Sequence, residues 1–313
     1  MRAAGVTEFG GPEALHIVDV PETHAGPGEV RIRVTAATVN PTDTYLVLGI
    51  YADRDPVKEP PFVPGMDVAG VLDEIGEGVD RPDLAVGAPV MGVVVPSGAH
   101  GGYRESIVLP ADSVVRAPKN ADDVAAATLP MNALTARLSL DLMGLQPGQV
   151  LAVTGAAGAY GGYVVQLAKA DGLTVVADAS EADEQLVRDL GADVVVRRGD
   201  DVADRIREHL PEGVDGLADG SVQDAAVLPA VRDGGVVTTV RGYRGDGRPG
   251  LEVLPVLVRR VAEDHAALDR LREQAEQGVL TLRVARTFPA EQAAEAHRLL
   301  ARGGVRGRLV LTF

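Results

Sequence analysis

Side chains that can polarise a carbonyl group gather in one short stretch of the chain. Asn40 carries an amide, and Tyr45 and Tyr51 carry phenols; all three can donate a hydrogen bond to a substrate oxygen. The stretch follows an alternating, β-branched segment, residues 28–40, so it lies on a loop at the end of a predicted strand. Two plainer interpretations stay open: Asn40-Pro41 only ends the strand, and Tyr45 only packs. Asp43 reads as a turn or supporting residue, not as an acid catalyst.

A second stretch is suited to bind phosphate. Residues 151–162 read LAVTGAAGAYGG, an apolar strand that enters a turn of small residues, and a helix is predicted from Gly161 to Lys169. Turns of this kind bring backbone N–H groups and the positive end of a helix against a pyrophosphate. The spacing Ala156-x-Gly158-x-x-Gly161 is the dinucleotide fingerprint with alanine in the first place. A turn of some other α/β protein is the alternative. The candidate cofactor-binding residues here are Ala156, Ala157, Gly158, Ala159, Tyr160 and Gly161.

The next strand, LTVVAD, ends in an acidic residue that bears on the choice of dinucleotide. Asp178 lies 20 residues beyond Gly158, where a carboxylate can accept a hydrogen bond from a ribose 2′-hydroxyl. Three further carboxylates follow before the first cation, Arg188. A 2′-phosphate would be repelled there, so NADH is expected over NADPH. The alternative is that Asp178 caps the turn and Ser180 receives the phosphate.

A third group of candidates follows a later strand. Residues 234–240, GGVVTTV, are predicted as a strand, and Val240, Arg241 and Gly242 stand at its carboxyl end. Ligands of open α/β sheets bind at this end of the strands. Gly242 would let a cofactor approach the backbone, whereas the side chain of Arg241 could equally lie in solvent. We also predict that the ring of Tyr160 lies beside the turn and leaves the pyrophosphate path open.

Composition excludes several classes of function. The chain of 313 residues has a formal charge of −15 and no cysteine, which excludes disulfides, thiolate zinc sites, iron–sulfur clusters and a cysteine nucleophile. No basic block suits nucleic acid, and no apolar run approaches the ~20 residues of a membrane span. The six histidines are scattered without metal-ligand spacing. We expect a cytoplasmic protein, because no signal peptide is evident at the N-terminus.

The order of the predicted elements divides the chain into two domains. Short strands separated by Gly, Pro and Asp turns fill residues 1–122, which indicates an antiparallel, barrel-like domain. Strands and helices alternate over residues 123–286, which indicates a doubly wound parallel sheet. The tail, residues 287–313, returns to a final strand, GRLVLTF. It is expected to rejoin the first domain, so that the parallel-sheet domain is an insertion.

Four segments in this order resemble one superfamily. They are NPTDTYLVLGIY (40–51), PFVPGMDVAGVLDEIGEGV (61–79), the turn GAAGAYGGYVVQLAK and the C-terminal FPAEQAAEAHRLLARGGVRGRLVL. Together they resemble the medium-chain dehydrogenase/reductase superfamily, and within it the zinc-independent quinone oxidoreductase branch that includes zeta-crystallin. The resemblance implies a GroES-like β-barrel domain plus a Rossmann domain. Where the alcohol dehydrogenases hold zinc by Cys and Gly-His-Glu, this chain has Asn40 and Gly65-Met66-Asp67, so no zinc is expected.

The same resemblance implies an activity and a site. It places residues 40–51 at the nicotinamide and substrate cleft, and it places Thr135 at the start of the interdomain helix, near the nicotinamide. Thr135 could equally be a helix N-terminal or packing residue. The implied reaction is NAD(P)H-dependent reduction of a quinone or an α,β-unsaturated carbonyl compound, with the hydride supplied by the cofactor. The implied assembly is a homodimer, formed through an edge segment such as residues 251–258. Two other functions stay open: a metal-free alcohol or ketone dehydrogenase, and a nucleotide-binding sensor or structural protein with little catalysis.

Overall fold

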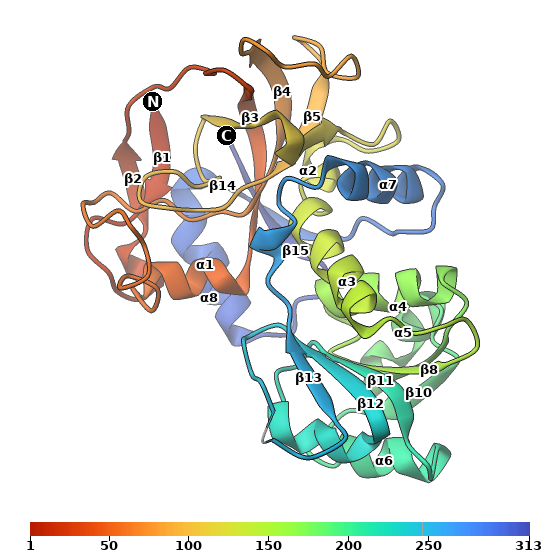
Figure 1. Cartoon of the computed structure of the whole chain (residues 1–313). Coiled ribbons are helices and arrows are strands. Elements are labelled where there is room, and N and C mark those ends of the chain that lie inside the picture. Colours follow the sequence, from red (N-terminus) through yellow and green to blue (C-terminus); the bar gives the residue numbers. More distant parts are fainter. Residues whose placement is uncertain (246) are drawn as a thin grey trace. The chain divides into compact units, whose positions relative to one another are not determined.

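The computed structural model describes residues 1–245 and 247–313. The chain divides into two compact units. The first unit comprises residues 1–131, 259–278 and 282–313, and the second comprises residues 132–258 and 279–281. The tail therefore rejoins the first unit, as predicted, and both termini lie in it (Figure 1). The division differs from the expected one in two places: the first boundary lies nine residues later, and the long helix near residue 270 belongs to the first unit.

The first unit is built on a seven-stranded sheet in the order β14-β15-β3-β4-β5-β7, with β6 paired to β3. Its neighbours are antiparallel except for β14 and β15, which run parallel. A separate antiparallel pair, β1 and β2, stands beside it. The strands are β1 (Arg2–Gly5), β2 (His16–Asp19), β3 (Glu29–Val39), β4 (Asp67–Ile75), β5 (Pro89–Val93), β6 (Ser106–Pro110), β7 (Val114–Arg116), β14 (Val284–Pro289) and β15 (Arg308–Thr312).

Helices and apolar side chains complete the first unit. Its helices are α1 (Pro41–Val47), α2 (Asp123–Ala126), α7 (His265–Glu276) and α8 (Ala293–Arg302), with short 3-10 helices at Pro12–Ala14, Ala111–Ser113, Val258–Arg260 and Ala290–Gln292. Alternate residues of β3 point into the core, as its period-two pattern requires. Ile32, Leu72, Ile107 and Phe288 are fully buried there.

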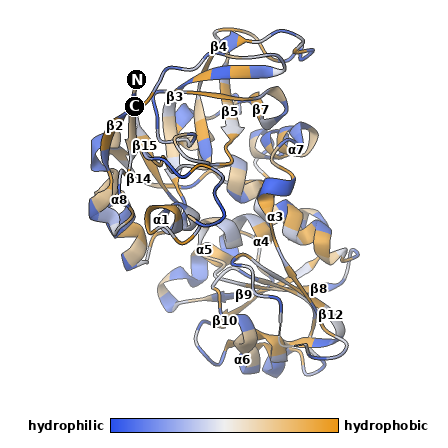
Figure 2. Ribbon diagram, turned by 60° about the vertical axis from the view of Figure 1, so that its left-hand side comes forward, coloured by the Kyte–Doolittle hydropathy of each residue, from blue (hydrophilic) through white to orange (hydrophobic). Residues whose placement is uncertain are grey.

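The second unit is a six-stranded parallel sheet in the order β10-β9-β8-β11-β12-β13. This is the expected Rossmann arrangement, and the strand order reverses between β8 and β11. Figure 2 shows hydrophobic colour along these strands, whose central residues are buried. The elements are β8 (Val150–Thr154), β9 (Thr174–Ala179), β10 (Val194–Arg197), β11 (Val214–Asp219), β12 (Val231–Thr239), β13 (Glu252–Pro255), α3 (Pro130–Met143), α4 (Ala159–Ala170), α5 (Glu184–Asp189), α6 (Val202–His209) and the 3-10 helices Glu181–Asp183 and Asp224–Ala230.

Two predicted elements differ from the structure. The sequence SVQDAAVLPAVRDG predicts a helix over residues 221–234. The structure instead has a 3-10 helix of seven residues there, and β12 already begins at Val231. Pro229 lies inside this short helix, and proline removes a backbone donor that a regular α-helix needs. The helix after the small-residue turn begins at Ala159 instead of Gly161, so Gly158 is its N-cap and Gly161 already lies in its first turn. Among residues 1–245 and 247–313, no helix is long and apolar enough to cross a membrane.

Candidate functional site

The small-residue turn after β8 has the geometry of a phosphate cradle, but its tight glycine is not the one expected. Gly155, just before Ala156, has a φ of +68°, which glycine adopts without strain. A Cβ on Gly161 would lie 2.4 Å from the Gly155 oxygen, so only glycine lets α4 approach the turn. Gly158 is the N-cap of α4 and provides no side-chain hydrogen bond to its first N–H groups. The turn therefore leads into a helix N-terminus whose capping residue has no side chain, as in sites where a helix N-terminus binds phosphate.

Asp178 lies near the end of β9, and only one of its two carboxylate oxygens accepts a hydrogen bond from the described residues. It is 3% exposed, and its Oδ1 accepts a hydrogen bond of 3.2 Å from Ala156 N. Its Oδ2 is buried and has no hydrogen-bond partner among the described residues. Burial raises the pKa of Asp178, while the N–H groups of Ala156 and Gly155 and the charge of Arg198 oppose that rise. Asp178 therefore caps the turn and also keeps one buried acceptor, which a ribose hydroxyl would satisfy.

The other carboxylates near Asp178 are each bonded within the chain. Glu181 pairs with Arg197 at 3.2 Å, and Glu184 pairs with Arg188 at 2.8 Å. Ser180 donates its hydroxyl proton to Asp183. These carboxylates are therefore paired, contrary to what their order in the sequence indicates. A further cation, Arg198, lies nearby, and its backbone N–H donates to Ala179 O beside the end of β9. Parallel pairing of β10 with β9 brings Arg198 there. Of the carboxylates expected to repel a 2′-phosphate, Asp178 alone thus supports a preference for NADH.

The carboxyl edge of the sheet carries further polar groups that sequence reasoning did not select. Val240, Arg241 and Gly242 follow β12 at this edge, as predicted, and a Cβ on Gly242 would meet nothing within 4 Å. After β11, Gln223 Oε1 and Asp224 Oδ1 are buried without hydrogen-bond partners among the described residues. Val222 and Asp224 have φ values of 58° and 53°, a left-handed backbone that costs ordinary residues energy. Glycine at positions 222 and 224 would have indicated a left-handed backbone, but the sequence has Val and Asp there. The sequence therefore gives no sign of this segment.

Thr135 and Tyr160 also belong to the second unit. Thr135 lies in the second turn of α3, not at its start, and is 9% exposed. Tyr160 lies on α4, and its hydroxyl is 2.7 Å from the Oγ of Ser139 on α3. The ring of Tyr160 lies against Gly220, which follows β11, since a Cβ there would be 2.9 Å from the ring. It therefore sits beside the turn, as predicted; whether it leaves a path for pyrophosphate stays a prediction.

In the first unit, the structure corrects the role expected for Asn40. Its side chain is fully buried, and Nδ2 donates to Asp67 Oδ2 at 2.9 Å. Its Oδ1 accepts a hydrogen bond of 2.5 Å from Arg308. The amide is thus held inside the protein, because β15 brings Arg308 to it, and it does not face a substrate oxygen. Asn40 serves the site by fixing the start of α1, where it forms a capping box with Asp43.

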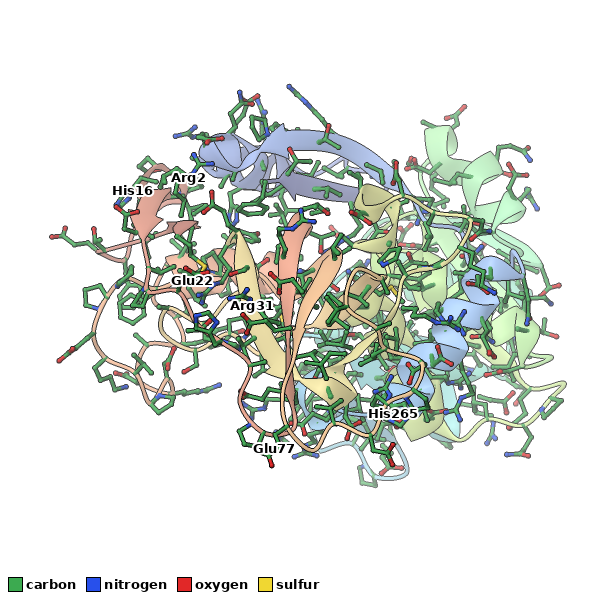
Figure 3. The ribbon with its side chains drawn as sticks, turned by 90° about the horizontal axis from the view of Figure 1, so that it is seen from above. Arg2, His16, Glu22, Arg31, Glu77 and His265 are labelled. Carbon is green, nitrogen blue, oxygen red and sulfur yellow. The ribbon has the colours of Figure 1, made fainter. Side chains whose placement is uncertain are left out.

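The positions that match zinc ligands of alcohol dehydrogenases form a protein-only cluster. Asp67 is fully buried and accepts hydrogen bonds from Thr38 at 2.7 Å and from Met131 N at 2.5 Å, besides the one from Asn40. Arg308, 5% exposed, lies 3.5 Å from the same carboxylate. We call Thr38, Asn40, Asp67 and Arg308 the Asp67 cluster. No group of three or more metal-ligating side chains occurs within residues 1–245 and 247–313, and Figure 3 shows His16 and His265 far apart.

The two tyrosines of this segment lie together. Tyr45 lies on α1 and Tyr51 just beyond it, and their rings meet edge to face with centroids 5.9 Å apart. Both side chains are half-buried. Partial burial raises the pKa of Tyr51, and the charge of Arg54 opposes that rise. The Tyr51 phenol therefore stays protonated near neutral pH and can donate a proton. Both tyrosines carry a phenol that can donate a hydrogen bond.

Asp43 supports the segment that carries these tyrosines. It is buried and accepts hydrogen bonds from Asn40 N at 2.8 Å, Gly65 N at 3.0 Å and the Tyr103 hydroxyl at 3.0 Å. His297 lies on the other side of that hydroxyl, 3.2 Å away. Burial raises the pKa of Asp43 to about 6, and burial lowers the pKa of His297 to about 4. Asp43 is thus a supporting residue, as expected, and joins three segments of the first unit.

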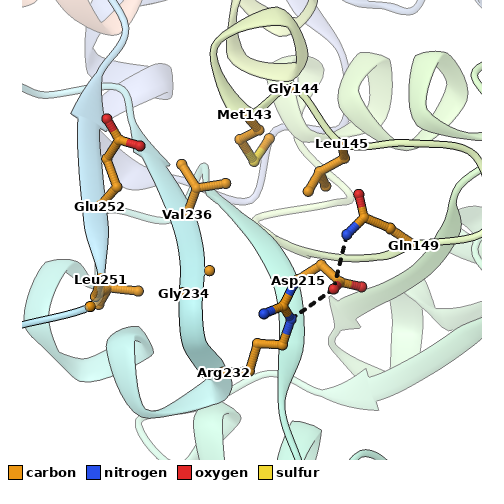
Figure 4. Close-up of a pocket in the computed structure, with 12 residues that line it drawn as sticks. Met143, Gly144, Leu145, Gln149, Asp215, Arg232, Gly234, Val236, Leu251 and Glu252 are labelled. Carbon is orange, nitrogen blue, oxygen red and sulfur yellow. Dashed lines mark hydrogen bonds and ion pairs between the residues drawn. The ribbon is translucent and has the colours of Figure 1, made fainter.

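A cavity of about 520 Å³ opens at the opposite edge of the parallel sheet (Figure 4). Its polar wall is Asp215, which accepts hydrogen bonds from Val150 N at 2.7 Å, Gln149 at 3.1 Å and Arg232 at 2.8 Å. These residues stand at the amino ends of β8, β11 and β12. Ligands of such sheets bind at the carboxyl ends, so this cavity lies apart from the candidate cofactor site. The ion pair of Arg31 with Glu22, at 3.4 Å, belongs to the first unit and is not part of the candidate cofactor site (Figure 3).

Comparison with known proteins agrees with this geometry. Residues 26–119 match the alcohol dehydrogenase GroES-like domain, and residues 190–311 match the zinc-binding dehydrogenase family. A 2-haloacrylate reductase of a Burkholderia species is 32% identical over 99% of this chain and 98% of its own length. The human quinone oxidoreductase is 30% identical over 99% of this chain and 97% of its own. The chain belongs to the quinone oxidoreductase group of the medium-chain dehydrogenase/reductase superfamily.

The fold of this family is shared over the full length. A mycobacterial protein solved in complex with NADPH has a TM-score of 0.86 to this chain at 27% identity, with all of both chains covered. One matching family is named for zinc binding, yet in this member Asn40 and Met66 replace the expected zinc ligands, and Asp67 is committed to the Asp67 cluster. The family assignment thus supplies the reaction class, while the residues of this chain define how its site is built.

Proposed function

We propose that this protein is a zinc-independent, NADH-preferring reductase of quinones or α,β-unsaturated carbonyl compounds. The family is one of NAD(P)H-dependent oxidoreductases, and the relatives named above act on a quinone and on a 2-haloacrylate. One observation carries the proposal. The glycine-lined turn and the unpartnered Oδ2 of Asp178 stand together at the carboxyl edge of a parallel sheet. A dinucleotide supplies the phosphates and the ribose hydroxyls that this arrangement requires.

Different strands of the sheet carry the residues that would hold different parts of the cofactor. Gly155, Gly158 and Gly161 shape the phosphate cradle. Asp178 would accept the ribose 2′-hydroxyl, and the segment 240–242 would border the nicotinamide. When bound, the nicotinamide supplies the hydride. The chain itself must then position the acceptor and deliver a proton.

The tyrosine pair supports that second task. Hydride addition to an enone or quinone leaves an anionic oxygen or carbon, which one proton neutralises. The Tyr45 and Tyr51 phenols meet at 5.9 Å between centroids and are half-buried. We assign them to hydrogen bonding of the acceptor carbonyl, one of them also donating the proton. Asn40 holds this segment in place through the Asp67 cluster.

Side-by-side assays separate the three candidate functions. NADH oxidation is followed with 9,10-phenanthrenequinone, with a 2-alkenal and with a saturated ketone. We expect turnover with one or both of the first two and none with the ketone. Turnover of the ketone alone would instead favour a metal-free ketone dehydrogenase. Cofactor binding without turnover of any acceptor would favour a sensor or structural protein.

A pair of variants tests the preference for NADH. Asp178→Ser removes the acceptor proposed for the 2′-hydroxyl, and Arg198→Ala removes the nearby cation. We expect wild-type kcat/KM to favour NADH, Asp178→Ser to lower it for NADH by about 10-fold, and Arg198→Ala to affect NADPH only. The NADPH complex of the mycobacterial neighbour makes the opposite preference a real alternative. A wild-type preference for NADPH would overturn this part of the proposal.

We also propose a homodimer formed along β13. This strand lies at the end of the six-stranded order, so one of its edges is unpaired within the described chain. Unpaired edges readily add a strand from a second copy. Light scattering of the purified protein should give twice the 32.5 kDa of one chain. A Val253→Pro variant should shift the mass to that of the monomer, because proline removes a ladder donor.

A further inference from the structure

Tyr160 makes a contact pattern that a small residue at this position could not make. It is the second residue of α4, in the first turn beside the phosphate cradle. Its ring lies against Gly220, where a Cβ would be 2.9 Å from Cδ1 and 3.1 Å from Cε1. Glycine at 220 therefore makes room for the ring at the end of β11.

The phenol also joins two helices. The Ser139 hydroxyl donates its one proton to the Thr135 carbonyl oxygen at 2.9 Å. In the 2.7 Å contact between the two hydroxyls, the Tyr160 phenol must then be the donor. Ser139 is fully buried, so this hydrogen bond is shielded from water. Burial raises the pKa of Tyr160 to about 12, which keeps the donated proton in place across the physiological range. The bond ties the first turn of α4 to α3.

The direction of this link identifies one half of the candidate cofactor site. The strand order reverses between β8 and β11, with β9 and β10 on one side and β12 and β13 on the other. A dinucleotide bound across such a point lays one nucleotide on each half. Asp178, at the end of β9, belongs to the half proposed for the adenosine ribose. Tyr160 reaches away from it, over the end of β11 and to α3.

We propose that Tyr160 is a positioning residue for the nicotinamide half of the cofactor. Its ring and its bond to Ser139 join the first turn of α4 to α3 and the end of β11, on the side of the site away from Asp178, so that the nicotinamide half of the site is formed before the cofactor arrives. The inference rests on the proposed dinucleotide site, and it adds a residue whose side chain, not its backbone, serves binding. Preformed sites bind more tightly because less order is lost on binding.

A double-mutant cycle on binding tests the link. The variants are Tyr160→Phe, Ser139→Ala and the double variant, and the probes are NADH and AMP, titrated by fluorescence and calorimetry. One lost hydrogen bond corresponds to about a fivefold change. We expect each single variant to raise the Kd for NADH about fivefold, the double variant to raise it by no more, and the Kd for AMP to stay unchanged.

Controls keep the outcomes distinct. Tyr163→Phe removes a phenol oxygen from the same helix one turn later and should leave both Kd values unchanged. Equal losses for AMP and NADH, or fully multiplicative losses in the double variant, would overturn the positioning role. If wild-type protein binds AMP but neither NADH nor NADPH, the proposed dinucleotide function fails instead. Near-ultraviolet circular dichroism of Tyr160→Phe checks that the fold is retained.

Discussion

Asp67 in the first unit and Asp178 in the second are both buried carboxylates at the ends of strands, yet their surroundings differ. Around Asp67, hydrogen bonds from Thr38, Asn40 and Met131 N fill the carboxylate. Within the Asp67 cluster, Arg308 Nε is the one buried side-chain atom without a hydrogen-bond partner among the described residues. Around Asp178, an acceptor oxygen stays unpartnered, as do the acceptors of Gln223 and Asp224 along the same edge of the sheet.

This difference distinguishes polar groups that stabilise the fold from polar groups that are available to bind a ligand. Buried polar atoms in native proteins are nearly always bonded, and leaving one unbonded costs free energy. In the Asp67 cluster, the chain's own groups bond both oxygens of the Asp67 carboxylate and leave only Arg308 Nε unbonded among the described residues, at positions where alcohol dehydrogenases hold zinc. The edge at Asp178 meets the requirement for bonding only when hydroxyl or amide donors arrive from outside. Substitutions in the first cluster should therefore affect stability most, and substitutions at the edge should affect binding most.

Arg308→Met should produce the largest change. The substitution removes the cation beside the buried Asp67 carboxylate, and breaking a buried pair from one side costs about 3–5 kcal/mol of unfolding free energy. Urea unfolding followed by circular dichroism measures it. Arg188→Met is the matched control, since its pair with Glu184 is exposed and should be worth about 0.5 kcal/mol or less. A loss below about 1 kcal/mol for Arg308→Met would show that the Asp67 cluster does not hold the first unit together.

The pH dependence of the neighbouring Asp43 and His297 should come next. The pKa of Asp43 rises from 3.8 to about 6, so its contribution to stability is present at low pH and lost as pH rises through 6. The pKa of His297 falls from 6.5 to about 4, so its contribution is present above pH 6.5 and lost as pH falls through 4. Each amounts to about 3 kcal/mol. As pH rises from about 4 to about 6, the Asp43 contribution falls while the His297 contribution grows, so the two changes in the free energy of unfolding nearly offset each other.

Asp43→Asn removes one side of this balance. The variant keeps the His297 contribution alone, so its unfolding free energy should fall by about 3 kcal/mol relative to wild type as pH is lowered from 6.5 to 4. Urea midpoints at each pH measure the difference in slope, which is independent of any constant loss from the substitution. His297→Gln should show the opposite slope. Parallel pH curves for wild type and both variants would rule out this account.

Gly161→Ala should damage the second unit at its cofactor edge. The added methyl would lie 2.4 Å from Gly155 O and 2.8 Å from Ala156 Cα, and these backbone atoms cannot yield without moving the cradle. We expect a loss of about 1–3 kcal/mol in stability and at least a 10-fold weaker Kd for both NADH and AMP. Gly10→Ala, whose new methyl meets only the Ala14 Cβ at 3.3 Å, is the control. Unchanged affinity would mean that this turn is not the phosphate site.

Local patterns predicted much of this architecture. The structure contains the strand predicted from the alternating residues 28–40. It also contains the alternating strands and helices predicted after residue 123, and its C-terminal tail lies in the first unit. The cradle and Asp178 could also be located from spacing, because a βαβ unit fixes the distance between a turn and the end of the next strand.

The parts that sequence could not predict depend on contacts distant in the chain. Asn40 receives Arg308 from 268 residues away, which turns an expected substrate donor into a buried structural group. Arg198 reaches Asp178 only through the pairing of β10 with β9. Gly155, not the residue at the fingerprint's first position, makes the tight turn. In each case a tertiary neighbour decides the role of a residue whose type alone allows several.

Val222→Gly should give the smallest and most discriminating change. Val222 is 38% exposed and has a φ of 58°, which costs a non-glycine residue about 1–2 kcal/mol, while glycine adds about 0.5–1 kcal/mol of chain entropy. We expect the variant to be about 0.5–1 kcal/mol more stable in urea, yet to bind NADH more weakly, because the freed segment no longer holds Gln223 and Asp224. Val95→Gly, 45% exposed and without a left-handed φ, should lose stability and keep its affinity. Equal losses of stability in the two variants would show that the segment carries no strain, and the contrast between a filled cluster and an edge held ready for a ligand would then rest on Asp178 alone.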